Sequence, residues 1–388
     1  MKQRHPQNGR RTNGSERGKS VTIVGSGGAI GSHLVPHVAR MPSVSRVTLI
    51  DPDRYESHNL ASQEIEARDV GKLKVSVQGR RVRRINPMLT VNTIAERVES
   101  IPLGALRCDV ILACLDGRKA RIAVNEAAWR LGIPWIDAGV GGEQWIARVN
   151  GYRPGDGAPC MECAWNDDDY AAVEQTYPCG DGVDPVAPTN SPSHLGGLAA
   201  AMQAAECEKI VSARGDTTLA GRQIVLDARS QGQIVSRLVR NPNCRFAHRT
   251  WKICPVTIRS LGVTIGDLLQ KVGISAAQFD SAALELPGHT FVQTLACVDC
   301  QRKSSRRLRI VRRLKGRAAQ CPGCGGRMVA GGFDQIERVR VNQVTGSELR
   351  RSLRSVGFRD RDVLGVSVGD EMQMVELKID PNEEGTEQ

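Results

Sequence analysis

The stretch that decides the fold is Val21-Thr22-Ile23-Val24, followed at once by Gly25-Ser26-Gly27-Gly28-Ala29-Ile30-Gly31-Ser32. The first four residues predict a buried strand, and residues 32–40 after the glycines predict a helix. A glycine-rich turn between a strand and a helix brings backbone N–H groups close to a phosphate, because glycine has no Cβ in the way. The spacing departs from the G-x-G-x-x-G pattern, because Ile30 stands at the sixth position. On the glycines alone, the loop of a dinucleotide-binding dehydrogenase is an equally good interpretation.

Strand-like and helix-like stretches alternate along the next part of the chain. Strands are expected at 46–50, 89–94, 110–114 and 135–138, and helices at 72–84 and 117–131. This alternation predicts an α/β fold with a Rossmann-like, doubly wound and mostly parallel sheet. Apolar and polar residues alternate more clearly at 145–150, 223–228 and 233–239, which predicts an antiparallel extension of the sheet.

Three polar residues stand where a ligand is expected. Asp51 ends the strand 46–50, where a carboxylate can hydrogen-bond the hydroxyls of a ribose. Asp116 follows the strand 110–114, so it is placed to hold Mg²⁺ or to orient phosphates, and capping of the next helix is the alternative. Lys74 could neutralise phosphate charge, although a solvated surface lysine is the more common role.

In this order, the motifs resemble those of the ThiF/MoeB/HesA superfamily. Its members include ubiquitin-activating enzymes and the enzymes that activate the sulfur carriers of thiamine and molybdenum-cofactor synthesis. The resemblance covers about residues 20–250. It rests on the glycine loop, Leu49-Ile50-Asp51-Pro52-Asp53, Asn59-Leu60 with Gln63, Val70-Gly71 with Lys74, Ile85-Asn86-Pro87, and Leu115-Asp116 followed by Ala120-Arg121 and Asn125.

The resemblance implies an adenylation reaction. The C-terminal glycine carboxylate of a ubiquitin-like protein attacks ATP, which yields an acyl-adenylate and pyrophosphate. The site residues that it implies are Gly25, Gly27 and Gly28 at the phosphates, Asp51 at the ribose, Lys74 at the phosphates, Asp116 at Mg²⁺, Asp53 as a further nucleotide-binding residue, and Asn59 and Arg121 in support.

One position departs from the family pattern. The family usually has arginine in its Asn-Leu-x-Arg-Gln stretch, and this chain has Ser62 there. Another arginine must therefore supply the missing charge, or adenylation is weakened. In homodimers of this type a second arginine often comes from the partner subunit's N-terminus, and the basic tail of this chain offers Arg10, Arg11 and Arg17.

Cysteine usage indicates zinc. The chain has 12 cysteines, several in C-x-x-C pairs, with no secretory signal and no apolar run long enough to span a membrane. We therefore expect a cytoplasmic protein with zinc sites rather than disulfides. Two structural zinc sites are predicted, one from Cys160, Cys163, Cys244 and His248, and one from Cys297, Cys300, Cys321 and Cys324, whose spacing is that of a zinc ribbon. For the first set, unpaired thiols beside a surface histidine are the alternative.

Cys179 is the expected nucleophile. It lies in the segment before the helix expected at 194–210, where the superfamily carries the cysteine that forms a thioester or a persulfide. It has no C-x-x-C partner, and Gly180 follows it where thioester-forming relatives commonly have threonine. An incidental loop cysteine is the alternative.

The organisation expected along the chain has three parts. Residues 1–20 form a basic flexible tail, residues 21–255 an ATP-binding adenylation domain, and residues 256–388 a small C-terminal zinc-ribbon domain. The net charge of +11 is concentrated in the tail and the ribbon. The basic stretch 301–320 fits a solvated or protein-docking ribbon hairpin better than a nucleic-acid site, because it has no aromatic residue to stack on bases.

Three functions remain open from the sequence. The first is activation of a ubiquitin-like protein, with thioester formation at Cys179 and transfer to a conjugating enzyme, in a bacterial conjugation system for which antiviral defence is one candidate role. The second is activation of a sulfur carrier for thiamine or molybdenum-cofactor synthesis. The third, motivated by Ser62, is an inactive scaffold.

Overall fold

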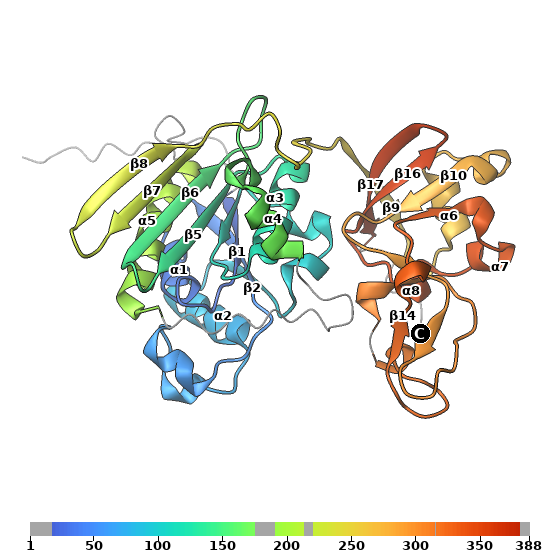
Figure 1. Ribbon diagram of the computed structural model, residues 1–388, viewed down its shortest axis with the longest axis horizontal. Coiled ribbons are helices and arrows are strands. Elements are labelled where there is room, and N and C mark those ends of the chain that lie inside the picture. The colour runs from blue at the N-terminus through green and yellow to red at the C-terminus, as the bar shows by residue number, and fades with distance from the viewer. Residues whose placement is uncertain (1–17, 175–190, 213–219, 315, 381–388) are drawn as a thin grey trace, which may run out of the picture.

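The computed structural model describes residues 18–174, 191–212, 220–314 and 316–380 (Figure 1). Two halves lie side by side in Figure 1, each built around its own sheet. The N-terminal half, drawn from blue to yellow, is built on a sheet of eight strands, and the C-terminal half, drawn from orange to red, on a main sheet of five.

The large sheet has the strand order β3-β2-β1-β4-β5-β6-β7-β8. Its first five strands pair in parallel, and β6, β7 and β8 continue the sheet antiparallel. The predicted mixed sheet with an antiparallel extension is therefore confirmed. The strands are β1 (Lys19–Val24), β2 (Val44–Ile50), β3 (Thr90–Ile94), β4 (Val110–Ala113), β5 (Trp135–Gly141), β6 (Ile146–Tyr152), β7 (Arg222–Asp227) and β8 (Gly232–Arg237).

The helices between these strands are α1 (Gly31–Val38), α2 (Lys74–Ile85), α3 (Arg118–Leu131), α4 (Asp167–Glu174) and α5 (Ser193–Val211). Four of the five helices lie close to their predicted positions, and α4 was not predicted. Pro87 follows the end of α2, as expected for a residue that cannot continue a helix. Gly132 ends α3 in the left-handed conformation at φ 69°, which glycine adopts without strain.

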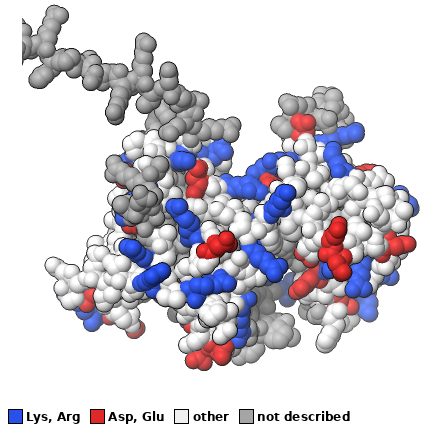
Figure 2. Space-filling model, turned by 90° about the horizontal axis from the view of Figure 1, so that it is seen from above, with Lys and Arg blue, Asp and Glu red and all other residues white. Residues whose placement is uncertain are grey.

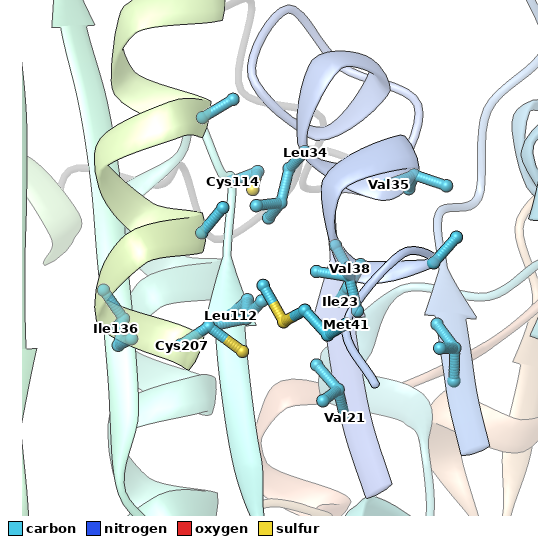
Figure 3. Packing of buried hydrophobic residues seen from close by; sticks show 14 of the residues in the cluster. Val21, Ile23, Leu34, Val35, Val38, Met41, Leu112, Cys114, Ile136 and Cys207 are labelled. Atoms are coloured by element: carbon cyan, nitrogen blue, oxygen red, sulfur yellow. The ribbon is translucent and has the colours of Figure 1, made fainter. Parts of the chain in front are cut away.

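Both faces of the large sheet are buried. On one face, Leu34 and Val38 of α1 and Cys207 of α5 pack with Ile23 and Leu112 of the sheet (Figure 3). On the other face, α3 packs against a second set of strand residues, which includes Val24, Ile111 and Trp135. Successive strand residues thus point to opposite faces, which is why these strands read as continuous apolar runs.

Gln203 of α5 joins the helix to the strand ends. Its side chain is fully buried, and Nε2 donates to Ala113 O at 3.0 Å and to Ile136 O at 2.8 Å. Its Oε1 accepts from Cys114 Sγ at 3.2 Å. One side chain therefore binds a backbone carbonyl at the end of β4 and another near the start of β5.

The C-terminal half has a separate core of buried residues, among them Leu268, Leu284, Leu364 and Leu377. Its five-stranded sheet has the order β15-β10-β16-β17-β9. Its larger elements are β9 (Ile253–Ile258), α6 (Ile265–Lys271), β10 (Ala282–Glu285), β15 (Arg338–Arg340), α7 (Gly346–Leu349), α8 (Leu353–Val356), β16 (Val363–Val368) and β17 (Glu371–Ile379).

Two small strand pairs lie between β10 and β15 in the sequence. They are β11 (Phe291–Val292) with β13 (Arg309–Ile310), and β12 (Leu295–Cys297) with β14 (Met328–Ala330). The basic stretch 301–320 does not form the expected hairpin in the part that the structure describes, since β13 is the one strand there and Lys303 and Gln320 make isolated bridges. Burial of Leu308 and Ile310 in the core folds this stretch onto the domain instead.

No helix among the described residues combines the length and the apolar character needed to cross a bilayer.

We predict that Gln203→Met destabilises the fold by about 2–4 kcal/mol, because two buried backbone carbonyls lose their donor. Urea unfolding followed by tryptophan fluorescence measures the change. Gln233→Met, at an exposed position of β8, is the matched control and should leave the unfolding midpoint unchanged. Equal midpoints for Gln203→Met and the wild type would show that these hydrogen bonds do not support the sheet.

Candidate functional site

The carboxyl ends of β1, β2 and β4 open onto one cleft of about 1680 Å³. The cleft brings together most of the residues singled out from the sequence. Those that line it are Gly25, Gly28, Asp51, Asp53, Asn59, Ser62, Lys74, Asp116 and Arg121. Gly27 is not among the lining residues, because the side chain of Lys74 packs directly against it.

The glycine loop is too tightly packed for side chains at three of its four glycines, and a Cβ at Gly31 would lie 2.1 Å from Gly25 O. Gly25 has φ +77°, and a Cβ there would lie 2.3 Å from Cys114 O. A Cβ at Gly27 would lie 2.4 Å from Lys74 Cβ. At Gly28 a Cβ would make only ordinary contacts. Gly25, Gly27 and Gly31 are therefore required by packing, whereas Gly28 is free to serve close approach of a ligand.

Asp51 organises the loop from the end of β2. Its Oδ2 accepts from Gly27 N at 2.9 Å, and its Oδ1 accepts from Asp53 N at 3.1 Å. Burial raises the pKa of this carboxyl, while nearby Lys74 and the two N–H groups oppose the rise. The sequence pointed to a ribose-binding carboxylate, but it did not reveal that the same group holds the glycine loop.

Lys74 begins α2 and reaches the cleft beside two carboxylates. Its side chain is only 10% exposed, and Nζ lies 3.4 Å from Asp53 Oδ2. Nζ also lies 5.8 Å from the centre of the Tyr55 ring. The neighbouring Lys72 points elsewhere and pairs with Asp69 at 3.6 Å. Lys74 is therefore a buried cation at the cleft, and Lys72 is not among the lining residues.

Asp116 lies in the turn after β4 and is exposed to the cleft. Arg121 holds this turn, because its guanidinium donates to Leu115 O and to Asp116 O. Arg121 Nε also donates to Asp137 Oδ1 at 3.0 Å. Arg121 thus supports the turn that carries Asp116, and its own position is set by a carboxylate on β5.

Sequence reasoning missed Asp137 and Arg148. Asp137 is buried in β5, and Arg148 Nη2 of β6 lies 3.9 Å from its Oδ2. A carboxylate within the apolar stretch Trp135-Ile136-Asp137-Ala138 was the signal that could have revealed it. Arg148 also lines the cleft, so it is a cation near the expected phosphates that the strand pattern alone did not single out.

Asn59 and Ser62 lie on the turn after β2. Asn59 is buried, and its Oδ1 accepts from Glu56 N at 2.9 Å, which closes the turn. Ser62 brings no charge to the cleft, and Arg54, Lys119 and Arg148 are among the cations that line it. The basic tail residues Arg10, Arg11 and Arg17 lie outside the described residues.

The first expected zinc set converges in space. Cys160 Sγ lies 3.8 Å from both Cys163 Sγ and Cys244 Sγ, and Cys163 Sγ lies 3.2 Å from His248 Nε2. Tetrahedral zinc with Zn–S bonds of about 2.3 Å separates two sulfurs by about 3.8 Å. His248 Nδ1 donates to Phe246 O at 2.6 Å, which leaves Nε2 free for a metal. These residues fit Zn²⁺.

The second expected zinc set also converges. Cys297 Sγ lies 3.4 Å from Cys324 Sγ, and Cys300 Sγ lies 3.6 Å from Cys321 Sγ. Hydrogen bonds from the backbone of Gly323 and Cys324 lower the pKa of Cys321 to about 6, which favours the thiolate that a metal requires. The two knuckles adjoin the β12–β14 pair. The set could hold zinc, and the name zinc ribbon stays a prediction.

Cys179 lies outside the residues that the structure describes. The described stretch resumes at Ser191, which is buried and lines the cleft. Cys114 and Cys207 are buried core thiols, and burial raises the pKa of Cys207 to about 12. Neither is therefore available as a thiolate.

The chain is similar in sequence to several known proteins. The UBA4 protein of Yarrowia lipolytica, named adenylyltransferase and sulfurtransferase, is 30% identical over 170 residues, which is 43% of this chain and 41% of that protein. The ubiquitin-like modifier-activating enzyme 5 of Aedes aegypti is 32% identical over 162 residues, 38% of this chain and 40% of that enzyme. The chain thus spans about two fifths of the length of these relatives.

Solved structures and a family model complete the comparison. The crystal structure of E. coli MccB with ATP is 24% identical and has a TM-score of 0.47, covering 58% of this chain and 66% of that chain. The model of the ThiF family matches residues 15–246. This match takes in all eight strands of the large sheet and the first zinc set apart from His248. Since it covers more than half of the sequence, the chain belongs to the ThiF family.

Proposed function

We propose that this protein uses ATP to adenylate the C-terminal glycine carboxylate of a ubiquitin-like protein. The observation that carries the proposal is the meeting of the glycine loop, Asp51, Lys74 and Asp116 in one cleft at the carboxyl ends of parallel strands. Relatives named for adenylyl transfer and for activation of ubiquitin-like modifiers support it. The activity is assigned to residues 21–255, with the tail 1–20 and the zinc-ribbon part 256–388 outside it.

The cleft suits the charge changes of adenylation. A carboxylate oxygen of the partner attacks the α-phosphorus of ATP, a P–O bond forms, and the bond to the β-phosphate oxygen breaks, so that pyrophosphate leaves. The glycine loop would receive the phosphates, with Gly28 leaving room for them and Gly25 and Gly27 allowing the tight packing of the loop, and Lys74 would stabilise the charge on the leaving group. Asp51 would accept hydrogen bonds from the ribose hydroxyls through the lone pairs that its two backbone donors do not use. Asp53 would lie beside it at the nucleotide.

Asp116 would bind Mg²⁺. It is an exposed carboxylate in the cleft, and Mg²⁺ is commonly held by one or two carboxylates together with waters and substrate phosphates. Bound Mg²⁺ would neutralise charge on the phosphates. Arg121 would keep Asp116 in position through the turn carbonyls, and Asn59 would support the turn after β2.

Cys179 would accept the activated acyl group. Its thiolate attacks the acyl carbon of the adenylate, a thioester forms, and AMP leaves, after which a conjugating enzyme receives the acyl group. Its place in the sequence supports this role, because Ser191, twelve residues later, lines the cleft.

Sulfur-carrier activation is the second candidate, since the relative from Yarrowia lipolytica is named a sulfurtransferase. In both cases a homodimer could bring a tail arginine to the cleft.

The first prediction concerns adenylation. Asp116→Asn and Lys74→Ala should each lower ATP–pyrophosphate exchange about a hundredfold, because each removes charge stabilisation at the phosphates. The assay uses full-length protein with a panel of ubiquitin-fold proteins that end in glycine. Lys72→Ala is the matched control, since Lys72 pairs with Asp69 on the same turn, and it should leave exchange unchanged. Absence of exchange with every ubiquitin-fold protein would favour an inactive scaffold.

The second prediction concerns the acceptor. Cys179→Ala should retain exchange but lose the covalent partner adduct that dithiothreitol cleaves, because adenylation precedes transfer to the thiol. Non-reducing gels with ATP and the partner measure the adduct. Cys254→Ala changes an exposed cysteine outside both zinc sets and should keep the adduct. An adduct that survives in Cys179→Ala would exclude Cys179 as the acceptor.

The third prediction concerns zinc. Two Zn²⁺ ions per chain are expected, and Cys244→Ser and Cys321→Ser should each remove one of them. Elemental analysis of purified protein gives the metal content, and a chelator should lower the melting temperature because bound metal stabilises the folded state. Cys254→Ser should keep both ions. Full zinc content in either ligand variant would refute that site.

A further inference from the structure

The C-terminal half is held against the cleft by charged side chains. Arg359 donates to Glu96 through both terminal nitrogens, at 2.8 and 3.0 Å. Glu376 has only 3% of its side chain exposed, and its carboxylate lies 2.9 Å from Arg107 Nε and 3.0 Å from Arg361 Nε. Figure 2 shows Lys and Arg side chains on both sides of the junction.

Close backbone contact accompanies these ion pairs. Gly104 N donates to Arg361 O at 3.0 Å, and Arg361 Nη2 donates to Gly104 O at 3.1 Å. A Cβ at Gly104 would lie 2.6 Å from Glu376 Oε1. The segment 96–107 therefore packs closely against the C-terminal half at Gly104, where a side chain would not fit.

The cleft includes both sides of this junction. Residues 96–103 line it from the N-terminal half, and Leu286, Pro287, Gly288, His289, Arg312 and Val363 line it from the C-terminal half. Its volume of about 1680 Å³ exceeds the range of about 300–1,000 Å³ that is usual for small-molecule sites. The family model matches residues 15–246, and the C-terminal half lies beyond them. The residues of the C-terminal half that line the cleft form a wall that the family match does not include.

The proposed orientation of ATP directs its base toward this wall. The phosphates would lie at the end of β1 and the ribose at the end of β2. The base is attached to the ribose on the side away from the phosphates. Since the sheet order is β3-β2-β1, the base then extends toward the segment that follows β3. That segment includes Glu96, to which the C-terminal half is bound.

His289 offers an unpaired acceptor in the wall. It is only 8% exposed, and burial lowers its pKa to about 4, so the ring is neutral near pH 7. Nδ1 lies 3.2 Å from Pro287 O, which can only accept, so Nδ1 carries the proton. Nε2 is then an acceptor, and it has no partner among the described residues. A buried acceptor without a donor is destabilising, which favours a ligand that supplies one.

We propose, on the basis of the ATP site above, that the C-terminal half closes the base end of that site, with His289 Nε2 accepting a hydrogen bond from the 6-amino group of adenine. Because Nε2 is shielded from water in this structure, the ring must tilt toward the base to make this bond. Arg312 is exposed and lines the cleft, so its guanidinium can stack on the purine. Hypoxanthine carries an oxygen at position 6, which cannot donate to His289.

The test is a binding measurement on the full chain with ATP, inosine triphosphate and inorganic tripolyphosphate. The wild type should bind ATP about tenfold more tightly than inosine triphosphate. His289→Phe should remove that preference and leave tripolyphosphate binding unchanged. Arg312→Ala should weaken both nucleotides but not tripolyphosphate, and Arg354→Ala, an exposed arginine outside the cleft lining, should change nothing.

Charge reversal tests the role of docking. Arg359→Glu should weaken ATP binding, and combining it with Glu96→Arg should restore the affinity, whereas tripolyphosphate binding stays constant. Equal affinity of the wild type for ATP and inosine triphosphate would overturn the proposal, as would unchanged ATP binding in both Arg312→Ala and Arg359→Glu. Because binding is measured without turnover, the proposal and the adenylation activity can fail independently.

Discussion

The buried carboxylate of Asp51 is the interaction on which the nucleotide cleft depends. It joins the glycine loop after β1, the end of β2 and, through Lys74, the start of α2. Burial alone favours its neutral form, and two backbone donors with a nearby cation favour the charged form. Movement of the loop away from β2 would leave this carboxylate buried and partly unpaired, so the carboxylate stabilises the loop in its observed position.

A second constraint keeps the neighbouring strand ends in place. Gln203 binds carbonyls of β4 and β5, and Arg121 binds carbonyls of the turn after β4 while it pairs with Asp137. The turn that carries Asp116 is thus held by Arg121 on the following helix, and the end of β4 before it is held by the distant Gln203. The C-terminal half adds a further wall through Arg359 and Glu376, so each part of the cleft is supported by polar contacts between separate segments.

Local patterns predicted the sheet well, and long-range contacts explain what they could not predict. The strands and helices of the large sheet follow from apolar runs and breakers such as Pro87 and Gly132. The expected site residues gather because parallel strands end at one edge. The roles of Gln203, Asp137 and His289 depend on neighbours that only the folded chain brings together. The hairpin expected at 301–320 was wrong because Leu308 and Ile310 pack into the core, and Cys179 stays a prediction.

The most direct test of the account identifies the products that the protein makes from ATP. Phosphorus NMR of the full chain with Mg²⁺, ATP and a glycine-ended ubiquitin-fold protein distinguishes cleavage at the α-phosphorus from cleavage at the γ-phosphorus. The account predicts that pyrophosphate accumulates as AMP becomes attached to the partner or is released on transfer. Formation of ADP and inorganic phosphate in place of pyrophosphate would contradict adenylation as the chemistry of this cleft.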